Sequence, residues 1–75
     1  MGTMHVLGRQ GDQVMTWDPE NALQTEHVRE AFNGKVAAGF TGFRVGPESL
    51  KDAERLSEFD PQAQRIVLVP QIAGG

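Results

Sequence analysis

Four consecutive aliphatic residues, Ile66-Val67-Leu68-Val69, constrain the fold of this chain more than any other segment. The run follows Arg65 and is ended by Pro70, so it predicts a β-strand over residues 65–69. Because both faces of that strand are apolar, we expect it to lie centrally in a sheet, buried on one face and partly covered on the other. The rest of the chain must therefore supply its neighbouring strands and a covering element.

Three further segments have the composition of strands. Residues 4–9 and 13–17 flank a glycine-containing turn at 10–12, which predicts an antiparallel hairpin. Alternation along the second arm places Met15 and Trp17 on one face, where Trp17 is expected to anchor the core. Residues 40–45 predict a third strand, ended by Gly46-Pro47.

One amphipathic helix is predicted to begin between Ala22 and Thr25 and to end near Ala38, before Gly39. Its apolar stripe is expected to contain Leu23, Val28, Ala31, Phe32 and Val36. Asp18 is a candidate cap for a preceding helical turn. Residues 48–58 are mostly polar and predict an irregular stretch with one short helical turn.

This element order predicts an α+β fold, with one helix lying across a mixed sheet of about four strands. We expect the last strand to lie beside the first and parallel to it. The predicted domain spans residues 4–69, and residues 70–75 form a tail that ends in Gly74-Gly75.

Composition excludes several classes of function. The chain has 75 residues and no cysteine, which rules out a disulfide, a cysteine nucleophile and a thiolate metal site. Its net charge of -3, with scattered basic residues, argues against nucleic acid as a partner. His5 and His27 lie far apart in the sequence, so we expect neither a metal site nor a catalytic residue. No membrane span or secretory signal is visible, and we expect a soluble cytoplasmic protein without a cofactor.

The order of elements and the glycine pair resemble ubiquitin and the related β-grasp carriers. Leu50-Lys51-Asp52 resembles the Leu-Glu-Asp step of ubiquitin, and Leu56-Ser57-Glu58-Phe59 resembles its Leu-Ser-Asp-Tyr step. The ending Pro70-Gln71-Ile72-Ala73-Gly74-Gly75 is also similar to the Pro-Pro-Val-Ala-Gly-Gly tail of the molybdopterin-synthase small subunit. A similar Pro-x-Ile-Ala-Gly stretch occurs in a ubiquitin-like tail-assembly protein of phages. The resemblance covers the whole chain in element order and its second half in motif.

The resemblance implies that the working group is the carboxylate of Gly75, with Gly74 and Ala73 as its narrow approach. The leading hypothesis is a prokaryotic ubiquitin-like modifier, which an ATP-dependent activating enzyme attaches to amines of target proteins. A conjugating enzyme and a deconjugating protease are optional further partners. The alternatives are a sulfur carrier with a C-terminal thiocarboxylate and a non-covalent phage or assembly module. Ala73 stands where ubiquitin has arginine, which puts recognition by a standard eukaryotic activating enzyme in doubt.

Two further sets of residues follow from the same resemblance. Arg44, Val67 and Val69 fall on the positions of the apolar patch by which ubiquitin binds partners. We therefore expect Arg44 to be exposed on that patch and Phe43 to lie in the core, although a shift of one residue would exchange them. Lys35 and Lys51 are the only lysines and hence the candidate side-chain acceptors for self-conjugation, although ordinary solvated charges are the simpler interpretation.

Overall fold

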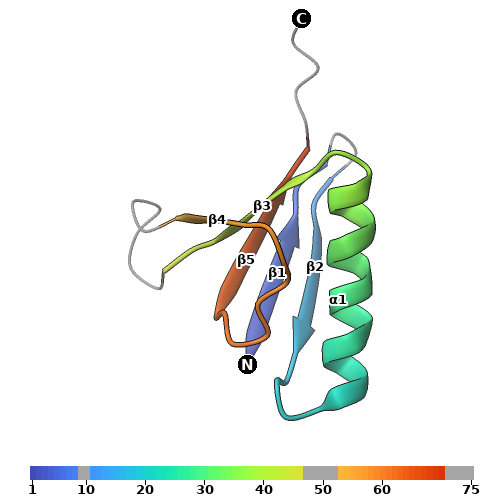
Figure 1. Cartoon of the computed structure of the whole chain (residues 1–75), viewed down its shortest axis with the longest axis vertical. Helices are drawn as coiled ribbons and strands as arrows, with labels where there is room; N and C mark the ends of the chain where they lie inside the picture. Colours follow the sequence, from blue (N-terminus) through green and yellow to red (C-terminus); the bar gives the residue numbers. More distant parts are fainter. Residues whose placement is uncertain (9–10, 47–52, 71–75) are drawn as a thin grey trace, which may run out of the picture.

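A computed structural model describes residues 1–8, 11–46 and 53–70 of the chain. Within these residues one helix lies against one mixed sheet of five strands (Figure 1). The elements in chain order are β1 (Gly2–Val6), β2 (Gln13–Trp17), α1 (Ala22–Ala37), β3 (Thr41–Arg44), β4 (Glu54–Leu56) and β5 (Arg65–Val69). The predicted α+β class is confirmed, and the arrangement is compatible with a β-grasp.

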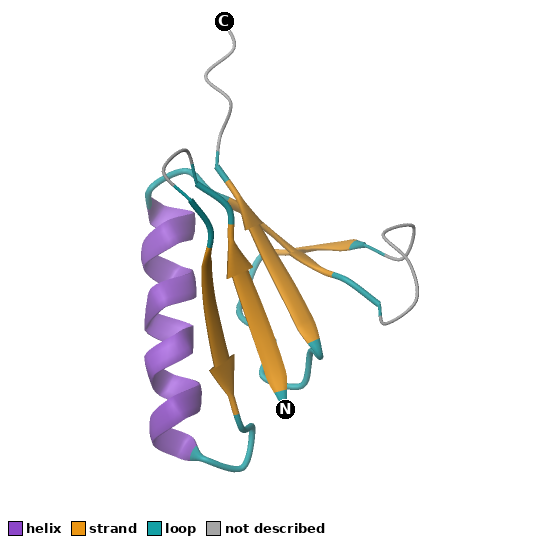
Figure 2. Cartoon of the chain, turned by 180° about the vertical axis from the view of Figure 1, so that it is seen from behind, coloured by secondary structure: helices purple, strands orange, loops and turns teal. Residues whose placement is uncertain are grey.

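The strands lie in the order β2-β1-β5-β3-β4, so β5 is the central strand, as its aliphatic run predicts. It pairs in parallel with β1 and antiparallel with β3. The hairpin of β1 and β2 is also confirmed, with Met4 opposite Met15. Figure 2 shows α1 running beside β1, β2 and β5, the three strands of five residues, while β3 and β4 diverge from the helix.

The strand count differs from the prediction because of β4. The residues that form it were expected to be irregular, whereas Glu54–Leu56 pairs with β3 and places Leu56 opposite Gly42. The strand has three residues, two of them charged, and therefore no periodicity that a sequence pattern could reveal. Residues 48–52 of that predicted irregular stretch lie outside the described residues.

The core forms between α1 and the inner face of the sheet. Its fully buried side chains come from three strands and the helix: Met4, Trp17, Val28, Phe32, Ile66 and Leu68. Trp17 lies 5.1 Å from Phe59, between ring centroids, and donates its Nε1–H to the carbonyl of Pro61 at 3.0 Å. Each such side chain removed from water stabilises the fold by roughly 1.5–3 kcal/mol. Trp17 is thus the core anchor that the alternation predicts.

The first strand begins earlier than expected. The domain was predicted to begin at residue 4, but β1 begins at Gly2, which is buried beneath the indole ring of Trp17. A Cβ atom on Gly2 would lie 2.2 Å from that ring, so only glycine fits without rearrangement. Two residues before the predicted boundary are therefore part of the sheet.

The helix has the predicted bounds but a narrower apolar face than expected. Its N-cap is Asn21, whose side chain accepts a hydrogen bond from the backbone N–H of Gln24, whereas Asp18 accepts from the N–H of Glu20 in the preceding turn. Leu23 was expected in the apolar stripe, but it is 85% exposed. It precedes the buried Thr25 by two residues, or about 200° around the helix, and so points away from the sheet. Gly39 follows the helix with φ 105°, which confirms it as the stop.

Candidate functional site

The predicted reactive end of the chain, Ala73, Gly74 and Gly75, lies outside the described residues. The structure does describe the strand from which it extends. Val69 pairs with Thr41 of β3, and Leu68 accepts a hydrogen bond from the N–H of Leu7 at 2.9 Å. The central strand is therefore held as far as Leu68 on the β1 side and as far as its last residue, Val69, on the β3 side, and this gives the C-terminal segment a fixed point of departure.

The sheet face opposite α1, here called the open face, carries one continuous row of side chains across all five strands. The pairing registers place Val14 opposite His5, His5 beside Val67, Val67 opposite Phe43, and Phe43 opposite Arg55. Cross-strand neighbours on one face are close enough for their side chains to interact. The centre of this row, Val67 and Phe43, is apolar and half-buried.

The expected positions of Phe43 and Arg44 are exchanged. Gly42 is buried and faces the helix, because a Cβ on it would lie 2.7 Å from the ring of Phe32. Successive residues of a strand point to opposite faces, so Phe43 lies on the open face and Arg44 on the helix side. Arg44 is exposed, as expected, but it lies on the opposite face from Val67.

Val67 and Val69 therefore share the open face with Phe43 in place of Arg44. Val69 lies two residues beyond Val67 on β5 and pairs with Thr41, so the three apolar side chains are neighbours on two adjacent strands. Of the patch expected from the resemblance, Val67 and Val69 lie on one face, and the ring of Phe43 stands beside them where Arg44 was expected.

The rim of the open face is basic. Arg55 ends the row described above, and Arg65 lies on the same face two residues before Val67, beside Thr3 of β1, while His5 lies within the row. Among the strand residues that the structure describes, none on this face carries a carboxylate. A shallow hollow of about 370 Å³ adjoins it, lined by Thr3, His5, Val45, Gln64 and Arg65. The face thus combines an apolar centre with cationic groups, a surface suited to an acidic, partly apolar partner.

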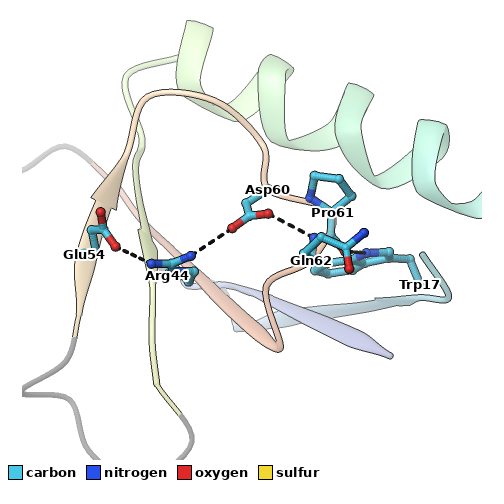
Figure 3. A network of polar contacts seen from close by, with 6 residues as sticks. All are labelled: Trp17, Arg44, Glu54, Asp60, Pro61 and Gln62. Carbon is cyan, nitrogen blue, oxygen red and sulfur yellow. Dashed lines mark hydrogen bonds and ion pairs between the residues drawn. The ribbon is translucent and has the colours of Figure 1, made fainter.

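Arg44 takes part in an ion-pair network on the helix side (Figure 3). Its guanidinium group bonds the carboxylate of Glu54 on β4 and lies 3.2 Å from the Asp60 carboxylate. The charge of Glu54, the hydrogen bonds that the guanidinium group donates to both carboxylates and the charge of Asp60 raise the pKa of Arg44 above its usual value, against an opposing effect of burial. Asp60 also accepts from the N–H of Gln62, so the network ties β3 and β4 to the turn that carries Pro61. Sequence reasoning missed this role because β4 was not expected.

The candidate acceptor Lys35 lies in the last turn of α1, whereas Lys51 lies outside the described residues. The ammonium group of Lys35 is 5.2 Å from the ring centroid of Phe40, and the residue lines a hollow of about 500 Å³ beside Val6 and Leu7. Because the side chain is half-buried and engaged with an aromatic ring, it is less free to react than a fully solvated lysine.

The two histidines are not brought together: His5 is on the open face and His27 is exposed on α1. Over residues 1–8, 11–46 and 53–70, no group of three or more His, Cys, Asp or Glu side chains is arranged to hold a metal ion. In the same part of the chain, no helix is long and apolar enough to span a membrane. A scan against models of known protein families, a search of curated proteins and a search of solved structures find no match to this chain.

Proposed function

We propose that this chain is a prokaryotic ubiquitin-like modifier, activated at the carboxylate of Gly75 and joined to amines of target proteins. One observation carries the proposal: a glycine pair follows the central, doubly paired strand of a sheet compatible with a β-grasp. Catalysis belongs to partner enzymes in this proposal, and their need for ATP assigns the protein to the cytoplasm. The chain contributes a reactive end, a fixed departure point for it and a docking surface.

The chemistry requires of this chain mainly that the activating enzyme can reach its C-terminal carboxylate. The Gly75 carboxylate attacks the α-phosphorus of ATP, forming a mixed anhydride with AMP and releasing pyrophosphate. The acyl group then passes to a cysteine of the activating enzyme, releasing AMP, and finally to a target amine, releasing the thiol. Gly74, which lacks a Cβ, and the small Ala73 suit the narrow channel such a transfer requires.

The open face supports the same proposal as a docking surface for the enzymes. Phe43, Val67 and Val69 lie on β5, which leads into the C-terminal segment, and on β3 beside it; Val69 is the last residue of β5 and pairs with Thr41, the first of β3. An enzyme that binds these residues would be well placed to receive the C-terminal carboxylate.

A sulfur carrier is the second candidate, favoured by Pro70 at the end of β5 and by Ala73 before the glycine pair. Hydrosulfide would then attack the acyl adenylate at the Gly75 carbonyl carbon, displacing AMP and leaving a thiocarboxylate on Gly75. Both functions begin with adenylation of the Gly75 carboxylate. They differ in what the activated acyl group reacts with, which is a target amine for the modifier and sulfide for the carrier.

The test uses the chain expressed in its native host with an affinity tag before Met1, which is 84% exposed. Wild type is compared with a variant lacking Gly75, by denaturing gel and intact mass. The modifier proposal expects higher-mass adducts that survive reductant and disappear without Gly75. Because the chain has no cysteine, such adducts cannot be disulfides formed by it.

Other results of this experiment would assign the chain differently. A free monomer with sulfur in place of one carboxylate oxygen would establish the carrier. The absence of both products, with equal melting temperatures for the two proteins, would reject C-terminal chemistry and leave a non-covalent assembly module.

A matched pair of substitutions tests the open face within the same experiment. Phe43→Ala removes the ring at the centre of the patch and is expected to reduce the adducts at least several-fold. Arg44→Ala, one residue along on the opposite face, is expected to leave them unchanged. The reverse result would mean that the enzymes dock on the helix side, where Arg44 lies. Thermal melting of both variants separates loss of docking from loss of fold.

A further inference from the structure

The two edges of the sheet are protected very differently. At one edge β4 has three residues, and Glu54 and Arg55 are charged. At the other edge β2 has five residues, Gln-Val-Met-Thr-Trp, without a charge or a proline. It pairs with β1 at five consecutive positions without a bulge. Short length, charges, prolines and bulges are the usual means of preventing an edge strand from pairing with another chain, and β2 has none of them.

The pairing pattern identifies the backbone groups that β2 presents. The N–H groups of Thr3 and Leu7 donate to the carbonyls of Gln64 and Leu68, so odd-numbered residues of β1 face β5 and even-numbered ones face β2. The residues of β2 opposite those even positions are Gln13, Met15 and Trp17.

Val14 and Thr16 therefore direct their N–H and C=O groups outward, away from β1. Neither residue appears in any further backbone hydrogen bond formed by the described residues. Both side chains are exposed on the open face, Val14 to 57%. A strand added here would hydrogen-bond to these two residues and extend the cross-strand row that begins at Val14.

Charge at the ends of β2 decides which occupant fits. Asp12 immediately precedes the strand, and Asp18 and Glu20 follow it. A second copy paired antiparallel about Met15 would place Asp12 opposite Asp18 of the other chain, and a parallel pair in register would place each acid opposite itself. Like charges directly opposite each other destabilise a strand pair. The acidic ends therefore disfavour self-association and favour a basic partner.

We propose that the outer edge of β2 binds an extended segment of a partner protein, apolar or β-branched in its centre and basic at both ends. Backbone hydrogen bonds to Val14 and Thr16 supply the affinity, and the acidic ends of β2 orient the segment. This binding surface is distinct from the C-terminal chemistry and does not depend on it.

The test measures binding of a synthetic peptide to the isotopically labelled full chain by amide chemical shifts. The probe is a capped Val-Thr-Val-Thr-Val segment with two lysines at each end. Saturable binding is expected, with the largest shifts and slowed hydrogen exchange at the amides of Val14 and Thr16. The same peptide with glutamates at its ends is expected to bind at least several-fold more weakly.

Two variants of one residue provide the matched control. Thr16→Pro removes an outward N–H without breaking a hydrogen bond to β1, and it is expected to weaken the lysine peptide about tenfold. Thr16→Val keeps the N–H and the shape, and it is expected to bind like wild type. Asp12→Asn combined with Glu20→Gln is expected to reduce the preference for lysine over glutamate ends. Thermal melting of every variant confirms that it is folded.

Three outcomes would overturn the proposal. The peptide could produce no saturable shifts, or its shifts could centre on the open face or β4 and persist in Thr16→Pro. The chain could instead form a dimer in sedimentation experiments that Thr16→Pro dissociates, which would make a second copy the occupant.

Discussion

At the scale of single residues, Gly42 determines which side chains reach the open face. The ring of Phe32 packs against it from the helix, where an added Cβ would lie 2.7 Å from the ring and 3.3 Å from Leu68. Because residue 42 points inward, residue 43 must point outward. A glycine in the core therefore places an aromatic side chain on the surface that we propose enzymes recognise.

Replacing Gly42 by alanine is expected to destabilise the protein by about 1–3 kcal/mol, because the packed ring of Phe32 must move. Urea unfolding followed by the fluorescence of Trp17 measures this change directly.

Gly34→Ala is the matched control in the same assay. Gly34 lies within α1, and apart from the adjoining backbone of the helix no atom of the described residues is within 4 Å of an added Cβ. Alanine is expected to stabilise the helix there by up to about 1 kcal/mol. If both substitutions shifted the free energy of unfolding in the same direction, the proposed contact between Gly42 and Phe32 would be wrong.

At the scale of elements, the start of α1 shows how the chain turns from β2 into the helix. Asp18 and Asn21 act in succession: the Asp18 carboxylate accepts from the N–H of Glu20, and its backbone carbonyl accepts from the N–H of Asn21 and from the hydroxyl of Thr25. Asn21 then accepts from Gln24 at 3.1 Å. These bonds connect the end of β2 to the first turn of the helix, where Asn21 provides acceptors for the N–H groups of Gln24 and Thr25.

Asn21→Ala is expected to lower the free energy of unfolding by about 1 kcal/mol, because the N–H of Gln24 loses its side-chain acceptor. Asn33→Ala is the control, since Asn33 is exposed within the same helix and is expected to be neutral or slightly stabilising. Chemical denaturation measures both variants. Equal losses would show that the effect comes from asparagine content and not from the cap.

At the scale of the whole molecule, Trp17 joins segments from both ends of the chain. Its ring covers Gly2, lies against Phe59 and holds the carbonyl of Pro61. The turn near Asp60 is in turn tied to β3 and β4 through Arg44. Opening of any of these segments would expose the indole ring to water.

We therefore expect the domain to unfold in one cooperative transition. Trp17 is the only tryptophan, so its fluorescence reports this junction, while far-ultraviolet circular dichroism reports the helix. The two signals are expected to give the same midpoint and the same free energy in urea. A fluorescence change at distinctly lower urea would reveal separate opening of the segment around Phe59 and Pro61.

Much of the fold could be predicted because strong local patterns are distributed along the chain. The aliphatic run of β5 predicted a central strand, the turn at 10–12 predicted a hairpin, and the spacing of Val28 and Phe32 predicted the helix. These features depend on burial of regular apolar patterns, which the sequence alone displays. The parallel pairing of β1 with β5 followed from placing those elements in one sheet.

Other features depended on contacts between residues distant in the sequence, and only the tertiary structure decided them. The pairing of β4 with β3, the burial of Gly2 under Trp17 and the face on which Phe43 lies have no local signal. A strand of alternating character has two possible faces, and the choice between them is made by what the opposite element can accommodate. Here the ring of Phe32 required a neighbour without a side chain, and that requirement placed Phe43 on the open face and Arg44 beside Glu54 and Asp60.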